Sequence, residues 1–455
     1  MPKKICFLHY GIGWRDGINT VIKTLATELQ KQNPSLGFYF LGGQIKEEIL
    51  AKSSYKVIPQ LLPKRKKITK KYLQEEGACI AKKLGQETKE MDVVIIENPF
   101  LGDYHLPAML GYSLYAKKYK PKSAKVFFRI HDFYQDFSKY SKNFQKLFSV
   151  KEIRDIIKGQ GVDGFLIVNQ ALREKLIKAG VKKEKIFYLP NGVDSRLFNQ
   201  SLSKENKKLI YQNLGIQPSK GVALPKILLY PVRVVPRKNI EEAILFVSFI
   251  RHLTKDNYIL VLAGKIERND PLSWDYYKKL KQLAEIVDWP IIFTEQAWPL
   301  EREYNQKREI KKFSIGDLYQ VAQAIIMTSL KEGFGYPYLE SWLAKKIVLG
   351  RRLGEVLKDF EKNGLQFDWL YTHLLEEKGN FNQRIKKVME IFKKPRLKRK
   401  ILKLNQINLN KQIKILQDKN KREKIIQTNL NQIKKVYEIS KISQRFSKIV
   451  GLVRS

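Results

Sequence analysis

The stretch KILLYPVRVVPRKN, residues 226–239, begins with an apolar run of strand length and ends in a turn that carries cations. A run that is apolar on both faces is typical of a strand in a parallel sheet covered on both sides. Open α/β sheets bind their ligands at the carboxyl ends of such strands. Arg233 and Lys238 lie at that position, where two cations suit a diphosphate. The alternative interpretation is a solvated loop.

Similar apolar runs, each followed by a segment with helical spacing, extend outward from this stretch in both directions. Six precede it and four follow it, at 4–10, 38–43, 92–98, 125–131, 164–170, 185–191, 257–265, 290–296, 324–330 and 346–352. A polar stretch near 199–222 separates the two series. Strands that alternate with helices in two series predict two α/β domains with parallel sheets. We therefore expect one α/β domain over residues 1–200 and a second over residues 201–375.

The region 376–455 has no strand signal and is predicted to be a basic helical C-terminal extension. Apolar residues recur there at helical spacing in three sets, with a phase slip between the last two: Leu397, Ile401 and Leu404; Ile426, Leu430, Ile433 and Tyr437; Ile439, Ile442, Phe446 and Ile449. Helices with one apolar stripe are predicted to pack against the rest of the protein. A basic amphipathic helix lying on a membrane is the alternative.

The charge of the chain is strongly positive. There are 86 Lys and Arg against 45 Asp and Glu, a net charge of +41, and the last 75 residues hold 22 basic and 4 acidic residues. This balance favours anionic partners, which are nucleotide diphosphates, anionic acceptors or an anionic lipid surface. A compositional bias with solvated helix faces explains it equally well. PKRKKITKKYL (63–73) has six basic residues in positions 64–71 and is a candidate membrane contact or a solvated helix.

The remaining composition excludes several classes of protein. Cys6 and Cys79 are the only cysteines, which argues against a disulfide framework and for a reducing, cytoplasmic location. No apolar run approaches the ~20 residues that span a bilayer. The histidines show no local ligand spacing, and there is no Asp-x-Asp pair, so we expect neither a metal nor a cofactor. No nucleic-acid reading motif accompanies the charge, so nucleic acid is not an expected partner.

The segment TSLKEGFGYPYLESWLAKK, residues 328–346, carries the strongest functional signal. It reads as a strand end, a glycine-bearing loop and a helix that starts near Pro337. Glu332 and Glu340 flank the loop, and carboxylates bind hydroxyl groups well, whereas the backbone amides between them suit a phosphate. A ligand with sugar hydroxyls at both ends of a diphosphate fits this arrangement.

A second glycine-bearing turn follows the first strand, in HYGIGWRDGINTVIKTLATEL (9–29). Gly11, Gly13 and Gly17 precede a segment with helical spacing, so a helix N-terminus able to attract an anion is expected there. The turn lacks the full dinucleotide-binding pattern of three spaced glycines with a later acidic residue. A nicotinamide cofactor is therefore disfavoured.

Together these segments resemble the retaining GT-B-fold glycosyltransferases of family 4, also called glycosyl transferases group 1. The Glu332 to Glu340 segment looks like the signature of that family. Four further matches follow the family's order, and the resemblance spans roughly residues 3–356: DGIN (16–19), RIHDF (129–133), LPNGVDSRLF (189–198), and Arg233 with Lys238. The resemblance implies an α/β protein with two Rossmann-like domains facing a cleft, the first on the acceptor side and the second binding the nucleotide-sugar.

The resemblance also implies roles for individual residues. Arg233 and Lys238 would hold the donor diphosphate, with Gly17 over the phosphates. Glu340 would bind the ribose, and Glu332 the hydroxyls of the donor sugar beside the amides of Phe334 and Gly335. His131 would contact the transferring sugar, although it ends an apolar strand and is also explained by capping from Asp132. The chain departs from the family in Asp16-Gly17, where paired glycines are usual, and in Gly350-Arg351-Arg352, where small residues are usual.

The expected reaction is transfer of a hexose from a UDP- or GDP-sugar with retention at the anomeric carbon. One hypothesis for the acceptor is a small anionic molecule, as in compatible-solute synthesis, recognised by Arg351 or Arg352. The alternative is a lipid or surface-polysaccharide acceptor, with the enzyme peripheral at the inner face of the membrane. A sugar-nucleotide epimerase on the same fold is a further alternative.

Overall fold

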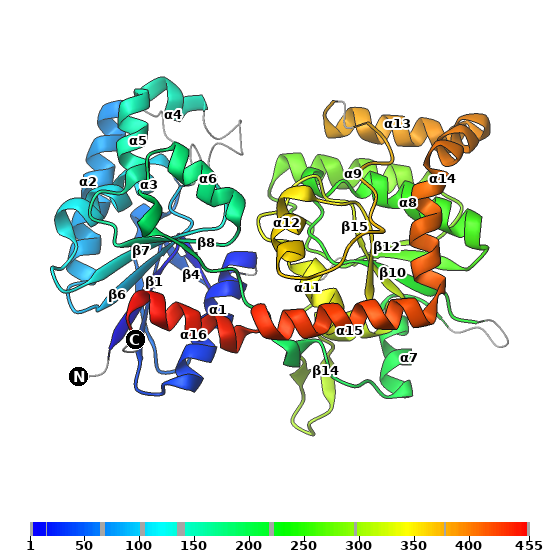
Figure 1. Cartoon of the computed structure of the whole chain (residues 1–455), viewed down its shortest axis with the longest axis horizontal. Coiled ribbons are helices and arrows are strands. Elements are labelled where there is room, and N and C mark those ends of the chain that lie inside the picture. Colours follow the sequence, from blue (N-terminus) through cyan, green and yellow to red (C-terminus); the bar gives the residue numbers. More distant parts are fainter. Residues whose placement is uncertain are drawn as a thin grey trace. The chain divides into compact units, whose positions relative to one another are not determined.

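The computed structural model describes residues 3–14, 16–63, 69–100, 105–133, 142–217, 223–294, 298–376 and 379–452. The chain divides into two compact units (Figure 1). Unit 1 is Met1–Val193 with Val436–Ser455, and unit 2 is Asp194–Lys435. The boundary lies a few residues before the predicted one. The predicted extension 376–455 does not form a separate part, because its last helix belongs to unit 1 and the others to unit 2.

A seven-stranded sheet in the order β5-β3-β1-β6-β7-β8-β9 forms the centre of unit 1, and every neighbouring pair is parallel. The six strands predicted from apolar runs are confirmed. The strand β5, with the sequence SYKV, was missed because it is a largely exposed edge strand. The strands are β1 Lys4–Leu8, β3 Gly37–Gly42, β5 Ser54–Val57, β6 Val93–Glu97, β7 Lys125–Ile130, β8 Gly164–Ile167 and β9 Ile186–Tyr188, with a small parallel pair β2 Gly11–Ile12 and β4 Gln44–Ile45.

Helices pack on this sheet, and the one that comes last in the chain is part of its core. Ile439, Ile442 and Phe446 of α16 are buried in the same cluster as Phe7 of β1, and the rings of Phe446 and Phe7 stack with centroids 6.4 Å apart. Figure 1 shows α16 in red beside α1. The helices are α1 Gly17–Gln32, α2 Lys70–Glu87, α3 Leu106–Leu114 with a π-helical continuation Tyr115–Tyr119, α4 Lys142–Leu147, α5 Val150–Lys158, α6 Gln170–Lys178 and α16 Ile439–Val450.

Unit 2 is built on a five-stranded parallel sheet in the order β12-β11-β10-β15-β16. All five predicted strands are confirmed, and β10, β11, β15 and β16 are almost wholly buried. The strands are β10 Lys226–Tyr230, β11 Tyr258–Leu262, β12 Ile291–Phe293, β15 Ala324–Met327 and β16 Ile347–Gly350, with an antiparallel pair β13 Glu303–Tyr304 and β14 Ile310–Lys312. The helices are α7 Lys204–Asn213, α8 Ile240–Thr254, α9 Pro271–Ile286, α10 Ile315–Val321, α11 Tyr336–Leu343, α12 Gly354–Lys362, α13 Phe381–Lys393, α14 Pro395–Gln417 and α15 Lys419–Val436.

The helices from residue 381 onward pack on unit 2 until α15 ends. The helix α13 contacts α8 and α9, and α14 contacts α8 and β16. The stripe predicted from Ile426 to Tyr437 is buried, as expected. Its phase slip relative to the next stripe marks the break between α15 and α16. The stripe predicted at Leu397, Ile401 and Leu404 is wrong for Leu404, which is 72% exposed, because α14 buries the face that holds Leu409 and Gln412 instead.

No helix within the described ranges is both long enough and apolar enough to cross a membrane.

Candidate functional site

The carboxyl ends of β10 and β15 bring Lys238 and Glu332 together in unit 2. Lys238 closes a 3-10 turn, η8 Pro236–Lys238, that follows β10, and Glu332 lies in the loop between β15 and α11. The ammonium group of Lys238 donates to Glu332 Oε1, and both side chains are almost completely buried. Ser329 Oγ donates to the same carboxylate oxygen at 2.7 Å. The residues predicted to bind the diphosphate and the donor sugar are therefore direct partners.

Both members of this pair are charged near neutral pH. Burial acts to raise the pKa of Glu332, but Lys238 and Arg237 outweigh it and lower the pKa to about 2. Burial lowers the pKa of Lys238 to about 8, although the carboxylate of Glu332 opposes this shift. Because this ion pair is buried and has further hydrogen bonds, its ammonium and carboxylate groups are held in fixed positions.

Two arginines adjoin this pair. Arg237 Nη1 donates to the carbonyl of Lys331 at 2.8 Å and to Glu332 Oε2 at 3.2 Å. Arg233 is 44% exposed at its side chain and lies 3.5 Å from a Glu267 carboxylate oxygen. The sequence motif predicted Arg233 but not Arg237, because only the fold shows which of the cations in 233–238 turns toward Glu332.

The helix α11 positions the other predicted donor residues. Gly335 caps its N-terminus in the left-handed region with φ 87°, and an added Cβ there would lie 2.7 Å from Val356 Cγ1. The buried ring of Phe334 packs edge to face on Phe360, with centroids 5.5 Å apart. Phe334 and Gly335 thus sit at the positive end of the helix dipole, where an anion is stabilised.

Glu340 lies five residues after that cap in α11, about one and a half turns along the helix. Its carboxylate accepts a hydrogen bond from the Tyr319 hydroxyl at 2.8 Å. Burial raises the pKa of Glu340 to about 7, although the bond from Tyr319 opposes the shift. In contrast to Glu332, this carboxyl group therefore changes its protonation state near neutral pH.

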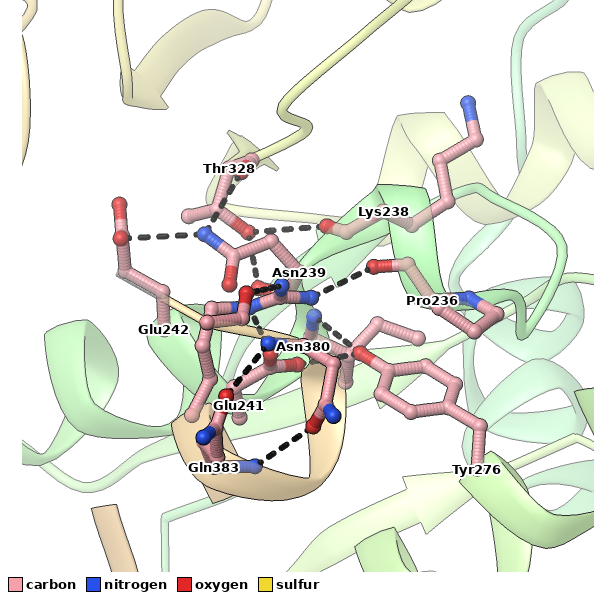
Figure 2. Close-up of polar contacts among 12 residues, drawn as sticks. Pro236, Lys238, Asn239, Glu241, Glu242, Tyr276, Thr328, Asn380 and Gln383 are labelled. Atoms are coloured by element: carbon pink, nitrogen blue, oxygen red, sulfur yellow. Dashed lines mark hydrogen bonds and ion pairs between the residues drawn. The ribbon is translucent and has the colours of Figure 1, made fainter. Parts of the chain in front are cut away.

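The turn that carries Lys238 is held from below by a buried polar network at the start of α8 (Figure 2). Asn239 adopts a left-handed conformation with φ 52° and donates to Glu242 at 3.0 Å and to the carbonyl of Thr328 at 3.2 Å. The Thr328 hydroxyl donates to the Asn239 carbonyl at 2.9 Å. The turn and the end of β15 are thereby tied to each other.

Arg351 and Arg352, the predicted acceptor residues, have carboxylate partners inside unit 2. Arg351 is buried, and its Nη1 lies 3.1 Å from Glu242 Oε2. Arg352 makes a bidentate pair with Glu361, with two distances of 2.5 Å, and its side chain is 35% exposed. The charge of Arg351 is compensated inside the protein by Glu242. Arg352 is also paired, but part of its side chain is exposed. A role in acceptor binding stays a prediction.

In unit 1, His131 lies at the end of β7 beside a buried acid. The distance from His131 Nε2 to Glu97 Oε2 is 2.6 Å. Burial acts to raise the pKa of Glu97, but Arg129 and His131 outweigh it and lower the pKa. An ionised carboxylate only accepts hydrogen bonds, so His131 carries a proton on Nε2. The predicted alternative of capping by Asp132 does not describe this ring contact, and Glu97 was missed, since it is 34 residues away in sequence.

Gly17 is the first residue of α1, and the side chain of Asp16 accepts from the Asn19 amide to cap the helix. No described atom lies within 4 Å of a Cβ built on Gly17. By contrast, a Cβ at Gly13 would lie 2.1 Å from the carbonyl oxygen of Glu47. The glycine at 13 therefore shapes the turn, whereas the position of Gly17 leaves space beside the helix N-terminus.

Two further predictions concern charge and metals. Residues 64–68, the centre of the basic segment 63–73, lie outside the described residues. Within the described ranges there is no group of three His, Cys, Asp or Glu side chains placed to hold a metal ion. Both cysteines are free thiols, and Cys6 is buried.

Comparison with protein families matches each half of the chain to a model. Residues 15–197 match the model described as Glycosyltransferase Family 4, and residues 216–408 match the model described as Glycosyl transferases group 1. The two matches together include all the predicted site residues.

Among curated proteins, the chain is 25% identical over 435 residues to mannosylglucosylglycerate synthase of Petrotoga mobilis, which covers 86% of this chain and 92% of that protein. It is 27% identical over 197 residues to mannosylglucosyl-3-phosphoglycerate synthase of the same organism, with 43% of this chain matched and 35% of that protein's length spanned.

Solved structures share the fold at low identity. HepE of Anabaena in complex with UDP and glucose superposes with a TM-score of 0.60 at 16% identity, over 99% of this chain and 100% of that one. Sucrose-phosphate synthase of Thermosynechococcus elongatus superposes with a TM-score of 0.64 at 12% identity, over 99% and 98% of the two chains.

Proposed function

The chain is a glycosyltransferase of the GT-B fold, and from this premise we propose that unit 2 binds a nucleotide-sugar and that a hexose passes with retention to a small anionic acceptor. The observation that carries the donor proposal is the arrangement at the carboxyl ends of β10 and β15. The Lys238–Glu332 pair, Arg233 and the N-terminus of α11 gather cations, a carboxylate and helix-end amides on adjacent loops. Solved relatives of the same fold hold UDP or UDP-glucose.

In the proposed reaction, the bond between the anomeric carbon and the diphosphate oxygen breaks, and a bond to the acceptor oxygen forms on the same face. The acceptor proton passes to the departing diphosphate. Arg233 and Lys238 stabilise the negative charge that grows on the leaving group, which lowers the barrier without a metal. Glu332 accepts hydrogen bonds from hydroxyls of the donor sugar, and Glu340 accepts them from the ribose. His131, whose ring is oriented by Glu97, contacts the transferring sugar.

The acceptor proposal rests on the relatives named above, whose names place a glycerate or phosphoglycerate in the product. We infer an acceptor with a glycerate-type carboxylate. Among the two arginines predicted for this role, Arg352 is the better candidate because its guanidinium is partly exposed.

A donor screen tests the first half of the proposal. Purified protein is measured by thermal shift and by donor hydrolysis with UDP-, GDP- and ADP-sugars, in the wild type and in Glu340→Ala. One class of sugar nucleotide is expected to stabilise the wild type and to do so less in the variant. Glu285→Gln, at an exposed position on α9, is the control and should behave as wild type. Failure of every sugar nucleotide to shift the transition would contradict the donor proposal.

An acceptor screen tests the second half, with the donor that the first experiment identifies. Glycerate, 3-phosphoglycerate and their glucosides are compared with neutral sugars of similar size. Product is expected only with acceptors that carry the carboxylate, and Arg352→Ala should raise the acceptor KM while leaving the donor KM unchanged. Equal use of neutral acceptors would overturn the anionic-acceptor proposal.

A second candidate is a peripheral enzyme with a lipid or polysaccharide acceptor, and one observation favours it. Leu404 and Ile407 of α14 are 72% and 75% exposed, and this helix contains seven Lys and Arg residues and no acidic residue. Exposed apolar side chains among cations suit an anionic lipid surface. The double variant Leu404→Ala/Ile407→Ala should lose binding to phosphatidylglycerol vesicles if this candidate is right, whereas Val150→Ala, which alters an exposed residue of unit 1, should not. Absence of vesicle binding by the wild type would exclude it.

A further inference from the structure

Arg384 of α13 reaches from the C-terminal helices into the base of the turn that carries the donor-binding cations. Its Nε donates to Glu241 Oε1 at 2.8 Å, and its Nη2 donates to the carbonyl of Pro236 at 3.1 Å. The guanidinium is mostly buried, and the Glu241 side chain is almost completely buried. One planar group therefore joins the start of α8 to the first residue of the turn Pro236–Lys238.

The partners of Arg384 are themselves fixed, as Figure 2 shows for Pro236, Glu241 and Tyr276. The Tyr276 hydroxyl donates to Glu241 and accepts from the Ile240 amide at 2.8 Å. At the far end of the turn, the Tyr230 hydroxyl donates to the Lys238 carbonyl at 2.6 Å. Both ends of the turn are therefore fixed by hydrogen bonds, and Arg384 donates the one at Pro236.

Arg384 also supplies the charge that this packing needs. Glu241 is buried at the N-terminus of α8, and an uncompensated carboxylate there is costly, since burial removes its water. Without Arg384, the start of α8 must rearrange or Glu241 must take up a proton. In either case the Pro236 carbonyl loses the hydrogen bond from Arg384, which loosens the backbone at 236–238, from which Lys238 extends to Glu332.

We propose that Arg384 is a positioning residue that sets the turn 233–238 for the donor diphosphate, so that the C-terminal helix α13 is part of the donor site. This inference rests on the proposed donor function. It assigns to α13 a role beyond covering α8 and α9. A misplacement of about 1 Å in such a turn is enough to lower a rate by on the order of 10²-fold.

The test separates diphosphate recognition from general stability. Dissociation constants for UDP, UMP, GDP and GMP are measured by calorimetry for the wild type, Arg384→Ala and Arg384→Lys, with thermal transitions in parallel. In the wild type, the nucleoside diphosphate that matches the donor should bind more tightly than its monophosphate. In both variants this ratio should fall about tenfold or more, because the contacts to the second phosphate are misplaced. Arg384→Lys keeps the charge near Glu241 but loses the fork that reaches Pro236, and should remain folded.

Lys387→Ala is the matched control, since it removes an exposed cation one turn further along α13. It should leave the ratio and kcat/KM unchanged. If folded Arg384 variants keep the diphosphate-to-monophosphate ratio of the wild type, the positioning role is overturned while the donor proposal stands. If the wild type binds none of the four nucleotides and the sugar-nucleotide screen, which includes ADP-sugars, is also negative, the donor proposal itself fails.

Discussion

Arg233 and Lys238 are predicted to serve the same phosphates, but they differ in what else depends on them. Arg233 is 44% exposed, whereas Lys238 is buried against Glu332. Arg233→Ala should therefore lower kcat/KM by ~10²-fold or more, as loss of one charge-stabilising donor does, with no change in the thermal transition. Lys238→Ala should lower kcat/KM similarly and also destabilise unit 2 by about 1–3 kcal/mol, because the buried Glu332 carboxylate loses one charged partner and keeps only Arg237 and Ser329.

Steady-state kinetics and calorimetry on the two variants check this difference. Arg268→Ala removes an exposed cation that follows Glu267 in the same loop and lies over the Trp274 ring, and it is a control expected to match the wild type. A rate for Arg233→Ala equal to that of the wild type would contradict the assignment of Arg233 to the diphosphate.

Glu340 predicts a pH dependence of donor binding. Because burial raises its pKa to about 7, the group is largely protonated at pH 6 and largely ionised at pH 8. An ionised carboxylate accepts hydrogen bonds from ribose hydroxyls with both oxygens, so the dissociation constant for UDP or GDP should decrease as the pH rises from 6 to 8. Glu340→Gln should remove this trend. The same trend in Glu340→Gln as in the wild type would show that another group is responsible.

The stability of the free enzyme should follow the opposite trend. A carboxyl group whose folded pKa is raised binds its proton more tightly in the folded state, so its contribution to the free energy of unfolding is present at low pH and lost as the pH rises to about 7. Burial also raises the pKa of Glu242 to about 7, so both groups contribute to this loss. The binding trend, not the stability trend, therefore isolates Glu340.

The sequence pointed to Lys238 and Glu332 as candidates for the proposed donor site, but it did not predict that they pair. Lys238 and Glu332 each stood out by position at a strand end. Their contact joins residues 94 apart in sequence, and that between Arg384 and Glu241 joins residues 143 apart. Such pairs depend on which strands are neighbours and on which helix covers them. A local motif contains neither piece of information.

At the scale of elements, the cap of α11 offers a sharp test. Gly335 has φ 87°, and an added Cβ would approach Val356 to 2.7 Å. Gly335→Ala should destabilise unit 2 by about 1–3 kcal/mol and weaken donor binding, because the loop must shift to relieve the strain. Gly354→Ala, at the first residue of α12 with open space around its Cβ, is the matched control. Thermal unfolding and nucleotide titration of both variants measure the difference, and equal stability of the two would refute the role of the cap.

The strands were the elements that the sequence predicted best. Eleven continuous apolar runs became strands of two parallel sheets, and most of these strands are buried. A strand that is covered on both faces is apolar on both, so it stands out in the sequence as a continuous apolar run. The exposed edge strand β5 escaped notice because it shares no such run. In α14, the residues that face the protein include Asn405 and Gln412, so hydropathy alone placed Leu404 wrongly on the buried face. The side-chain amide of Gln412 donates to the Gly350 carbonyl and accepts from the Gly350 backbone N–H. Because both of its polar atoms are hydrogen-bonded, the Gln412 side chain can be buried.

For the whole molecule, two cores predict two unfolding transitions. Phe446 is completely buried against Phe7 in unit 1, so Phe446→Ala should lower the stability of that unit by about 3–5 kcal/mol. A nucleotide that binds unit 2 should raise only the other transition. Calorimetry of wild type and variant, with and without UDP or GDP, distinguishes the two. Leu404→Ala, at an exposed position of α14, should change neither transition.

The sequence predicted two α/β domains and a helical extension, but it did not show to which unit each C-terminal helix belongs. The stripes of α15 and α16 have the same period and similar composition, so periodicity cannot show that one packs on unit 2 and the other on the sheet of unit 1. What differs between the two helices is the surface against which each apolar stripe packs. For α16 this is an apolar cluster of unit 1 that includes Phe7 and Phe40, which are far from α16 in sequence.

Because α16 completes the core of unit 1, the order in which a ribosome delivers the chain matters. Residues 439–450 emerge only after all of unit 2 has been made, although the sheet they cover begins at Lys4. Unit 2 is continuous in sequence and can fold before unit 1 is complete. Until α16 has been made, the apolar face that it covers on β1 and α1 stays exposed. The strand β1 and the helix α1 are thus made before unit 2, but their apolar face is covered only after α16, and it is open to association with other nascent chains during that interval.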